Sequence, residues 1–321
     1  MDYQEILKIL QLPEAEFRQT IMPLARQQYR QTDNRLYGTA MLGYTNICRN
    51  QCLYCGMRAG NSVPRFRIEP EDVVHSVALA HERGFHRVFL VAGEDPGYGF
   101  DRLLDMVAAL RTLGVRISLA CGEYSLSQYQ ELHDAGAEEY VVKFEMSQPQ
   151  TFNRLNPSTD FARRRTAMEA VKQSGMDLAS GNIIDYPGQT DEMIAEDILL
   201  MQELAISWAP VVPYLPAAGT PLAQEGGKPG DRVKALKEIA ILRLALPQVR
   251  ITAQQPGDDL TRGLADPAGN LDALNAGANL LFCDLLPEAQ ARAFRVVDYR
   301  ELKNEDHLRR MAAQSGMTLD L

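Results

Sequence analysis

The sequence predicts an α/β fold, a (βα)8 barrel of the TIM type with an N-terminal helical cap. From residue 39 onward, strand-like apolar runs alternate with amphipathic segments of helical period, as in a parallel sheet covered by helices. Eight such runs can be counted, and eight is the number of strands that closes a barrel. A doubly wound open sheet is the alternative. The chain of 321 residues, 45% of them hydrophobic, is long enough for one such barrel.

Helices are expected before residue 37, because two apolar stripes occur there at helical spacing. The stripes consist of Ile6, Ile9 and Leu10, then of Phe17, Ile21, Leu24, Ala25 and Tyr29. These helices should cover one end of the barrel. We therefore divide the chain into an N-terminal helical extension, residues 1–38, and a barrel with a C-terminal tail, residues 39–321.

The eight expected strands follow in order, each separated from the next by an amphipathic segment. The strands are Met41–Ile47, Arg87–Ala92, Arg116–Ala120, Tyr140–Phe144, Leu178–Ile184, Pro210–Leu215, Arg250–Gln254 and Ala278–Cys283. The helical segments are Glu69–Arg83, Phe100–Leu113, Ser125–Ala135, Asp160–Ser174, Asp191–Leu204, Pro229–Leu246 and Leu271–Ala276. Several of these helices should end at a glycine, which accepts the left-handed backbone of a helix terminus. The glycines are Gly84, Gly114, Gly136, Gly175 and Gly277.

Polar and charged residues follow the expected strands at the points where these end. The segments are Cys48–Gly56, Gly93–Pro96, Cys121–Tyr124, Lys143–Glu145, Asp185–Thr190, Gln254–Asp259 and Cys283–Asp284. In a parallel α/β fold, ligand sites form at the carboxyl ends of the strands. We therefore expect these residues to gather at one rim of the barrel.

Charge and hydropathy argue against several classes of protein. The formal net charge of −9 is spread along the chain, which argues against a nucleic-acid partner. Residues 1–14 lack the basic flank and apolar centre of a secretory signal. No run approaches the roughly 18 apolar residues of a membrane span. We therefore expect a cytoplasmic protein without membrane contact, in which clustered cysteines serve metal or redox chemistry.

Three of the five cysteines, Cys48, Cys52 and Cys55, lie together directly after the first strand. Thiolates at this spacing can turn inward onto one soft metal centre. Structural zinc normally requires four protein ligands and catalytic zinc three, and no histidine follows at ligand spacing. An iron–sulfur cluster with thiolates on three irons would leave a fourth iron open. The cluster is therefore the favoured interpretation, with zinc or incidental cysteines as alternatives.

The pattern Cys48-x3-Cys52-x2-Cys55 resembles the signature of the radical S-adenosylmethionine (SAM) superfamily, and Tyr54 and Gly56 fit it. The resemblance implies a 4Fe–4S cluster whose open iron is chelated by the amine and carboxylate of SAM. It implies that an electron from the cluster cleaves SAM to a 5′-deoxyadenosyl radical, which attacks a small substrate inside the barrel. It also implies an electron donor such as flavodoxin or ferredoxin.

From about residue 40 to about residue 285 the chain resembles one branch of this superfamily, the HydE maturases of FeFe-hydrogenase. Methylornithine synthase and biotin synthase are relatives of that branch. The matching segments are Cys48–Gly56, Arg65–Ile68, Gly93–Pro96, Gly122–Glu123, Glu145, Asn156–Pro157 and Pro187–Thr190. Of these, Gly122–Glu123 and Pro187–Thr190 favour the maturases. The implied substrate is small and either polar or organometallic.

The resemblance also implies a set of residues that bind SAM. They are Tyr54, Gly93, Glu94, Glu145, Arg164 and Ile183. Gly93 and Glu94 match the segment that holds the SAM amino group, and Arg164 matches an arginine that pairs with its carboxylate. Ile183 lies in a segment that packs against adenine. The structural alternatives are a solvated acid at Glu94, an ion pair between Lys143 and Glu145, a solvated basic helix face around Arg164, and strand core at Ile183.

Residues placed to touch the substrate match neither relative, so no catalytic residue is assigned. Lys143-Phe144 stands where the maturases have an Arg-His pair, and Gln254 lies where they have threonine and methylornithine synthase has serine. Cys121 and Cys283 each stand alone, either as buried apolar residues or as substrate contacts. Two other functions stay open. One is an amino-acid mutase like methylornithine synthase, and the other is a non-catalytic iron–sulfur or zinc protein on the same fold.

Overall fold

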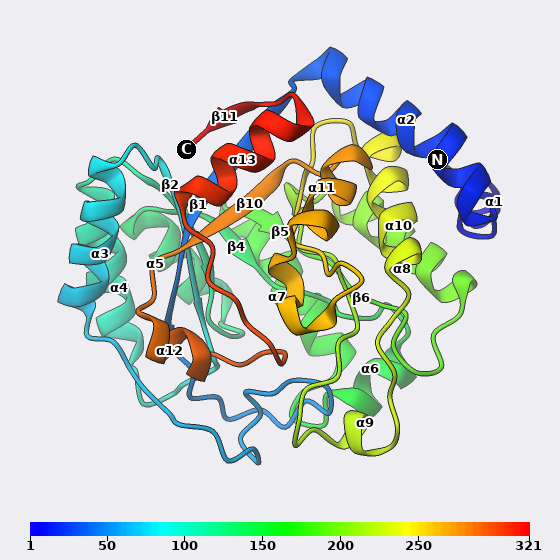
Figure 1. The fold of residues 1–321 in the computed structure, drawn as a ribbon. Coiled ribbons are helices and arrows are strands. Elements are labelled where there is room, and N and C mark those ends of the chain that lie inside the picture. The colour runs from blue at the N-terminus through cyan, green and yellow to red at the C-terminus, as the bar shows by residue number, and fades with distance from the viewer.

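The computed structural model describes residues 1–321 and contains a barrel of parallel strands (Figure 1). Around the barrel the strands are β10 Leu280–Asp284, β1 Arg35–Thr45, β2 Arg87–Ala92, β3 Arg116–Ala120, β4 Ala137–Val141, β5 Asp177–Ala179, β7 Trp208–Ala209 and β9 Arg250–Ile251. A parallel bridge between Thr252 and Leu280 joins the two ends of this order. The Ala253 amide also donates to the Leu280 carbonyl over 2.8 Å. The predicted TIM-type barrel is therefore confirmed.

The fifth and sixth strands of the barrel are each interrupted. Beyond β5 and β7, a second parallel pair forms from β6, Ile183–Ile184, and β8, Val212–Pro213. Pro210 lies between β7 and β8 and has no amide hydrogen, so it cannot continue the ladder. The strands predicted over residues 178–184 and 210–215 are thus present as two short pieces each.

Helices surround the barrel and cover its outer face (Figure 1). They are α3 Pro70–Glu82, α4 Phe100–Arg111, α5 Leu126–Ala135, α6 Pro149–Leu155, α7 Phe161–Gln173, α8 Asp191–Leu204, α9 Pro221–Gln224, α10 Arg232–Ala245, the 3-10 helix η1 Leu260–Ala265, α11 Pro267–Asn275, α12 Glu288–Ala293 and α13 Glu305–Ser315. In α4, the buried residues Leu103, Val107 and Leu110 recur at helical spacing. This apolar stripe packs on the outward faces of the strands and fixes the helix against the barrel.

The N-terminal cap consists of α1, Tyr3–Leu10, and α2, Glu14–Thr32. α1 packs on α8 and α10, and α2 packs on α10 and α11. The Lys237 ammonium of α10 donates to the carbonyl at the end of α1 over 2.7 Å. β1 begins at Arg35, so the division predicted between residues 38 and 39 falls inside this strand.

The C-terminal tail explains why the sequence pattern does not predict the first residues of β1, which begins at Arg35 and not at the predicted Met41. After α13, the strand β11, Thr318–Asp320, pairs in parallel with residues 35–37 of β1. Arg87 of β2 lies 3.0 Å from the Asp320 carboxylate and fixes this end. The amino-terminal part of β1 is therefore completed by residues from the far end of the chain, and neither α13 nor β11 is predicted by the sequence pattern.

The amino-terminal end of the barrel is sealed by a buried ion pair. Glu139 of β4 is fully buried and pairs with Arg250 of β9. Ser118 and Ser207 donate to the same carboxylate over 2.7 and 2.6 Å. Because this carboxylate is both paired and hydrogen-bonded, its burial is tolerated. Ligands therefore have to enter from the carboxyl end.

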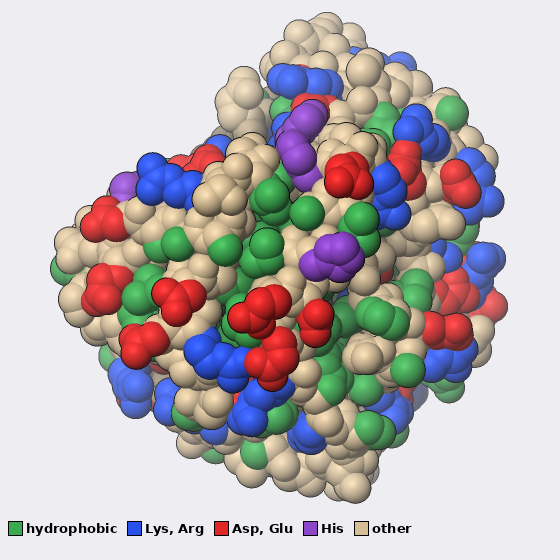
Figure 2. Space-filling view, turned by 90° about the vertical axis from the view of Figure 1, so that its left-hand side faces the viewer, with side chains coloured by type: hydrophobic (Ala, Val, Ile, Leu, Met, Phe, Trp, Pro, Cys, Tyr) green, Lys and Arg blue, Asp and Glu red, His purple; other side chains and the backbone are tan.

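Figure 2 looks onto the side of the molecule that carries α3 and α4. Acidic and basic side chains are interspersed across this face, in keeping with the spread of charge along the sequence. None of the helices combines the length and the apolar character that a membrane crossing demands.

Candidate active site

A cavity of about 440 Å³ lies at the carboxyl end of the barrel. Among the residues predicted to bind the cluster or SAM, those that line it are Cys48, Cys55, Gly93, Glu94, Glu145 and Arg164. Cys52, Tyr54 and Ile183 lie outside the lining. The expected gathering of polar residues at one rim of the barrel is therefore present. Those that line the cavity can contact the same ligand.

The cysteine loop, Cys48–Gly56, lies against the end of β2. The Arg49 amide donates to the Glu94 carbonyl over 2.9 Å. A Cβ atom on Gly93 would collide with the carbonyl of Ile47. Glycine is therefore required at residue 93, because a side chain there would push the loop away from the strand.

The three thiols of this loop are free and partly buried. Burial raises the pKa of Cys52 to about 12 and also raises the pKa of Cys55. Such thiols become thiolates when a metal supplies the compensating positive charge. No three His, Cys, Asp or Glu side chains are close enough to hold a single ion, whereas an iron–sulfur cluster spreads its thiolates over different irons. The donor set therefore suits a cluster better than one zinc ion.

The Glu94 carboxylate faces the cysteine loop. It forms an ion pair with Arg49 and accepts a hydrogen bond from Asn50 Nδ2 over 2.7 Å. Its side chain is 16% exposed, so Glu94 is not the solvated loop acid considered as an alternative. The carboxylate ties the loop to the end of β2 and still borders the cavity.

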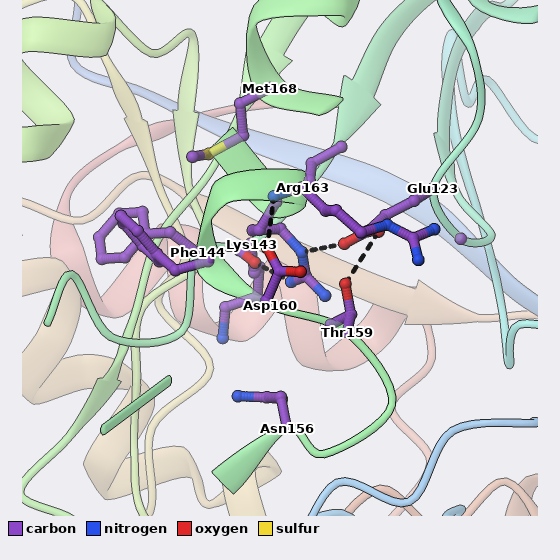
Figure 3. A network of polar contacts seen from close by, with 12 residues as sticks. Glu123, Lys143, Phe144, Asn156, Thr159, Asp160, Arg163 and Met168 are labelled. Carbon is purple, nitrogen blue, oxygen red and sulfur yellow. Dashed lines mark hydrogen bonds and ion pairs between the residues drawn. The ribbon is translucent and has the colours of Figure 1, made fainter. Parts of the chain in front are cut away.

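Arg164 of α7 borders the cavity and belongs to a polar network. Figure 3 shows this network with its partner residues Glu123 and Lys143 and with Thr159. The Arg164 Nε donates to Glu123 Oε1 over 2.6 Å, and its Nη1 donates to the Lys143 carbonyl. Thr159 donates to the second oxygen of Glu123 over 3.3 Å. Burial alone would lower the pKa of Arg164, but the Glu123 carboxylate outweighs it and the pKa is raised. Arg164 therefore stays charged, with Nη2 available to a ligand.

The neighbours of Arg164 in the arginine run face elsewhere. Arg163 is exposed, and Arg165 forms ion pairs with Glu169 and Glu203 on the surface. A solvated basic helix face therefore describes Arg163 and Arg165 but not Arg164. Sequence reasoning gives Glu123 no role of its own, although its place directly after β3 marks it as a rim acid.

Glu145 lies four residues after the end of β4, which stops at Val141 and not at the predicted Phe144, and it has a left-handed conformation, with φ at 60°. Its amide donates to the Gly181 carbonyl over 3.0 Å, and its carbonyl accepts from the Ile183 amide over 2.9 Å. The side chain lies 3.1 Å from the Lys143 ammonium, so the ion-pair alternative is observed. A positive φ at a non-glycine residue is uncommon and clusters at functional sites. Both partners of this pair line the cavity.

Tyr54 and Ile183 share a small apolar cluster below the cysteine loop. The Tyr54 hydroxyl donates to Asn156 Oδ1 over 2.7 Å, and burial raises the pKa of Tyr54 well above its usual value. The hydroxyl therefore stays protonated and anchors the loop to the residues after α6. Ile183 is buried in this cluster, so the strand-core alternative also describes it.

Three aromatic rings form the floor of the cavity. The centroids of Phe89 and Phe282 are 5.4 Å apart in a stacked arrangement, and Trp208 meets Phe89 edge-on at 5.0 Å. The Trp208 indole donates to Thr252 Oγ1 over 2.8 Å. Trp208 is the chain's single tryptophan. The sequence gives it no role, because the sixth strand is predicted to begin at Pro210, two residues after Trp208.

The residues left open for substrate contact separate into two groups. Lys143, Gln254 and Cys121 line the cavity, whereas Cys283 does not. Cys283 is 2% exposed and belongs to the core between strands and helices, so it is a buried apolar residue. The Cys121 thiol lies 3.1 Å from the Tyr140 hydroxyl at the edge of the cavity.

A segment near the C-terminus, residues 294–303, crosses the carboxyl end of the barrel and is called the strap below. The Gly56 amide donates to the Val296 carbonyl over 2.9 Å, which joins the strap to the cysteine loop. At its other end, Arg300 forms an ion pair with Asp284 of β10. Several strap residues line the cavity, and no strand or helix period in the sequence reveals them.

A barrel that presents free thiols above an enclosed cavity defines a class of metal-dependent enzyme, and comparison with known proteins identifies the class. The sequence profile of the Radical SAM superfamily matches residues 42–201. FeFe hydrogenase maturase subunit HydE of Thermotoga maritima is 30% identical over 298 residues, which cover 91% of this chain and 83% of the relative. The chain belongs to the radical SAM superfamily, whose enzymes use a 4Fe–4S cluster and SAM.

Two further relatives are similar over most of the chain. The 3-methylornithine synthase of Methanosarcina acetivorans is 27% identical over 277 residues, covering 85% of this chain and 76% of the relative. The crystal structure of methylornithine synthase superposes with a TM-score of 0.87 at 25% identity and covers 99% of this chain and 94% of that one. The whole barrel, and not the cysteine loop alone, is therefore of this type.

Proposed function

We propose that this radical SAM enzyme holds its cluster on Cys48, Cys52 and Cys55 and acts on a small substrate enclosed in the barrel, in the manner of the HydE maturases. The observation that supports the proposal is the partly buried Arg164, which borders the cavity and forms an ion pair with Glu123. When bound, the cluster and SAM supply a 5′-deoxyadenosyl radical.

The groups around the cavity are suited to the two ends of the methionine part of SAM. A guanidinium is always charged and binds a carboxylate at two positions, which suits Arg164 to the SAM carboxylate. The carbonyls of Gly93 and Glu94 and the Glu94 carboxylate are acceptors for the SAM ammonium. Glu145 adds a second carboxylate at the same rim.

The adenosine part would lie between the cysteine loop and β6. Tyr54 and Ile183 supply apolar surface there. Gly56 lets the strap approach the loop closely, because a Cβ atom at this residue would collide with the Arg295 carbonyl. The ion pair between Glu139 and Arg250 at the amino-terminal end and the strap at the carboxyl end narrow the access of water to the cavity, which favours the survival of a reactive intermediate. Substitutions of Tyr54 or Ile183 should therefore weaken the binding of SAM while the cluster is retained.

The substrate is proposed to be small and either polar or organometallic, as the similarity to HydE suggests. An amino-acid mutase reaction like that of methylornithine synthase is the second candidate, favoured by the structural similarity to that enzyme. An electron donor such as flavodoxin or ferredoxin, a cytoplasmic location and the lack of a nucleic-acid partner remain predictions. The division of the chain at residue 38 is likewise a proposal.

Anaerobic reconstitution tests the function directly. We expect about four irons per chain, because one 4Fe–4S cluster is bound. Added SAM and a low-potential reductant should then yield 5′-deoxyadenosine. A protein that carries the cluster but never cleaves SAM would contradict the proposal and favour a non-catalytic iron–sulfur protein. Hydrogenase genes beside this gene would favour the maturase reaction over the mutase.

A further inference from the structure

Arg65 donates hydrogen bonds to four backbone carbonyls in and around the cysteine loop. Nη1 donates to Asn46 over 2.6 Å and to Met57 over 2.8 Å. Nη2 donates to Arg58 over 2.7 Å and to Asn61 over 3.1 Å. No carboxylate pairs with Arg65, and residues 46–68 contain no Asp or Glu. The cation is therefore directed entirely at the backbone.

Two of these carbonyls lie on either side of the segment that contains the three cysteines. Asn46 precedes the first cluster cysteine by two residues, and Met57 follows the last by two. A single nitrogen of Arg65 therefore joins the two ends of the segment that holds all three thiols. Closing a flexible loop costs conformational entropy, and a group that holds its ends together reduces what metal binding must supply.

The backbone around Arg65 is held to the end of β1 by hydrogen bonds. The Phe66 amide donates to Asn46 Oδ1 over 2.8 Å, and the Ile68 amide donates to the Tyr44 carbonyl over 2.8 Å. Arg67 forms a bridge with Thr45 at the end of β1. The segment that carries Arg65 is thus attached to the barrel wall, as positioning groups require.

Only a guanidinium fits this arrangement. It carries five N–H donors in a rigid fork, whereas a lysine ammonium has three donors around one atom and prefers water. The four carbonyls approach Arg65 on two separate nitrogens, so one ammonium cannot reach them all. Replacing Arg65 by lysine would leave partly buried carbonyls without donors, which is costly.

We propose that Arg65 is a positioning residue that sets the shape of the cysteine loop before the cluster binds. This inference rests on the proposed function for its cluster, but the loop geometry can be measured in the cluster-free chain. Partners of this kind around a metal site typically change metal affinity by roughly 10- to 100-fold when removed.

The test compares Arg65→Lys with a matched control, Arg243→Lys. Arg243 is buried, whereas Arg65 is partly buried, and like Arg65 it lacks a carboxylate partner. Arg243 donates to the carbonyls of Gly277 and Pro247 over 2.8 and 2.6 Å. It lies in α10, away from the cysteine loop. Both variants lose a guanidinium that binds backbone carbonyls, so a general loss of stability affects them alike.

Two measurements separate the variants. In cluster-free protein, hydrogen–deuterium exchange of residues 46–57 should speed up on the order of tenfold in Arg65→Lys and stay unchanged in Arg243→Lys. After reconstitution, a chelator should remove iron at least about tenfold faster from Arg65→Lys than from the control. In Arg65→Ala, millimolar guanidinium, too dilute to denature, should slow the loss of iron by refilling the vacated position.

Equal loop exchange in Arg65→Lys and the unsubstituted protein would overturn the inference. So would equal iron loss in the two lysine variants, or iron loss from Arg65→Ala that guanidinium leaves unchanged. If the unsubstituted chain binds no iron, the proposed function fails instead, while the exchange measurement still decides the role of Arg65.

Discussion

The two sides of the cavity are built in different ways. On the side of the cysteine loop, each charged residue predicted to bind SAM has a partner of opposite charge: Glu94 with Arg49, Arg164 with Glu123, and Glu145 with Lys143. Elsewhere the cavity has an aromatic floor and is bordered by the strap, which Arg300 and Asp284 hold to the end of β10. The charged residues that the family resemblance predicts to bind SAM all lie on the first side, whereas none of the predicted residues belongs to the aromatic floor or the strap.

This difference shows how one barrel can keep a cofactor and change a substrate. The paired charges of the first side are fixed by partners within the wall, so a change in one group leaves another buried charge unpaired. The floor around Trp208 consists of aromatic rings, so an exchange of one ring for another apolar side chain leaves no charge unpaired. Variants on the first side should therefore act on the cluster and SAM, and variants on the second on enclosure and substrate.

The largest expected effect is that of Cys52→Ala on the first side. Removing one thiolate leaves the cluster with two protein ligands, so iron per chain should fall from about four to below one. Cleavage of SAM to 5′-deoxyadenosine should be abolished. Iron analysis and chromatography of the reaction check both points. Cys283→Ala is the control, because this buried thiol lies outside the cavity and its loss should leave both values unchanged.

Arg164→Ala should weaken SAM binding by roughly 10- to 100-fold while the cluster is retained, because a hydrogen bond to a charged group contributes about 1.5–3 kcal/mol. Equilibrium binding of SAM to the reconstituted variant measures this. The exposed Arg163→Ala serves as the matched control. Equal effects in both variants would mean that the charge of the helix face, and not the buried guanidinium, attracts SAM.

Asp284→Asn addresses the second side. The side chains of Asp284 and Arg300 are 5% and 16% exposed, and breaking a buried ion pair costs roughly 3 kcal/mol. The strap, residues 294–303, should therefore show faster hydrogen–deuterium exchange, while SAM affinity changes less than about twofold. Glu288→Gln, which breaks an exposed pair with Arg292, is the control. A loss of SAM affinity as large as that of Arg164→Ala would erase the distinction between the two sides.

The smallest effect, a change in stability, is expected at Glu238, a buried residue of α10 that does not line the cavity. This fully buried carboxyl shares the Asn182 amide with Asp197, and burial raises its pKa well above the usual value. Burial thus favours the neutral carboxyl, which glutamine mimics, and Glu238→Gln should change the free energy of unfolding by less than about 1 kcal/mol. Denaturant unfolding at pH 7 measures this. A larger loss would mean that Glu238 is ionised.

The same carboxyl pair predicts how stability depends on pH. Burial raises the pKa of Asp197 from 3.8 to about 7, so the folded protein binds a proton that the unfolded chain releases. The contribution of Asp197 to stability should therefore be complete below about pH 4 and be lost as the pH rises to 7. In Glu238→Gln, the further loss at alkaline pH that ionisation of Glu238 causes should disappear.

Much of the fold could be predicted because its signals are local. The bounds of β2 and β3 agree with the sequence pattern, since each is an uninterrupted apolar run between a helix and a polar turn. The sixth strand was harder, because Pro210 breaks its ladder and shifts its start to Trp208. The helices α1 and α2 followed from their apolar stripes, but the start of β1 did not, because β10 and β11 complete it.

By itself, the sequence determined the barrel, the cysteine loop and the rim acids, because strand and helix periods and ligand spacing are written in neighbouring residues. Only the tertiary structure decided that Arg164 pairs with Glu123, that Trp208 forms the floor, and that the strap closes the cavity. The contacts of Arg164 with Glu123 and of Trp208 with Thr252 join residues 41 and 44 positions apart, and such pairings depend on the closed barrel and not on any local period. The cysteine loop illustrates both cases. The spacing of its thiols predicts a metal site, whereas the hydrogen bonds from Arg65 to four carbonyls could not be predicted from the sequence.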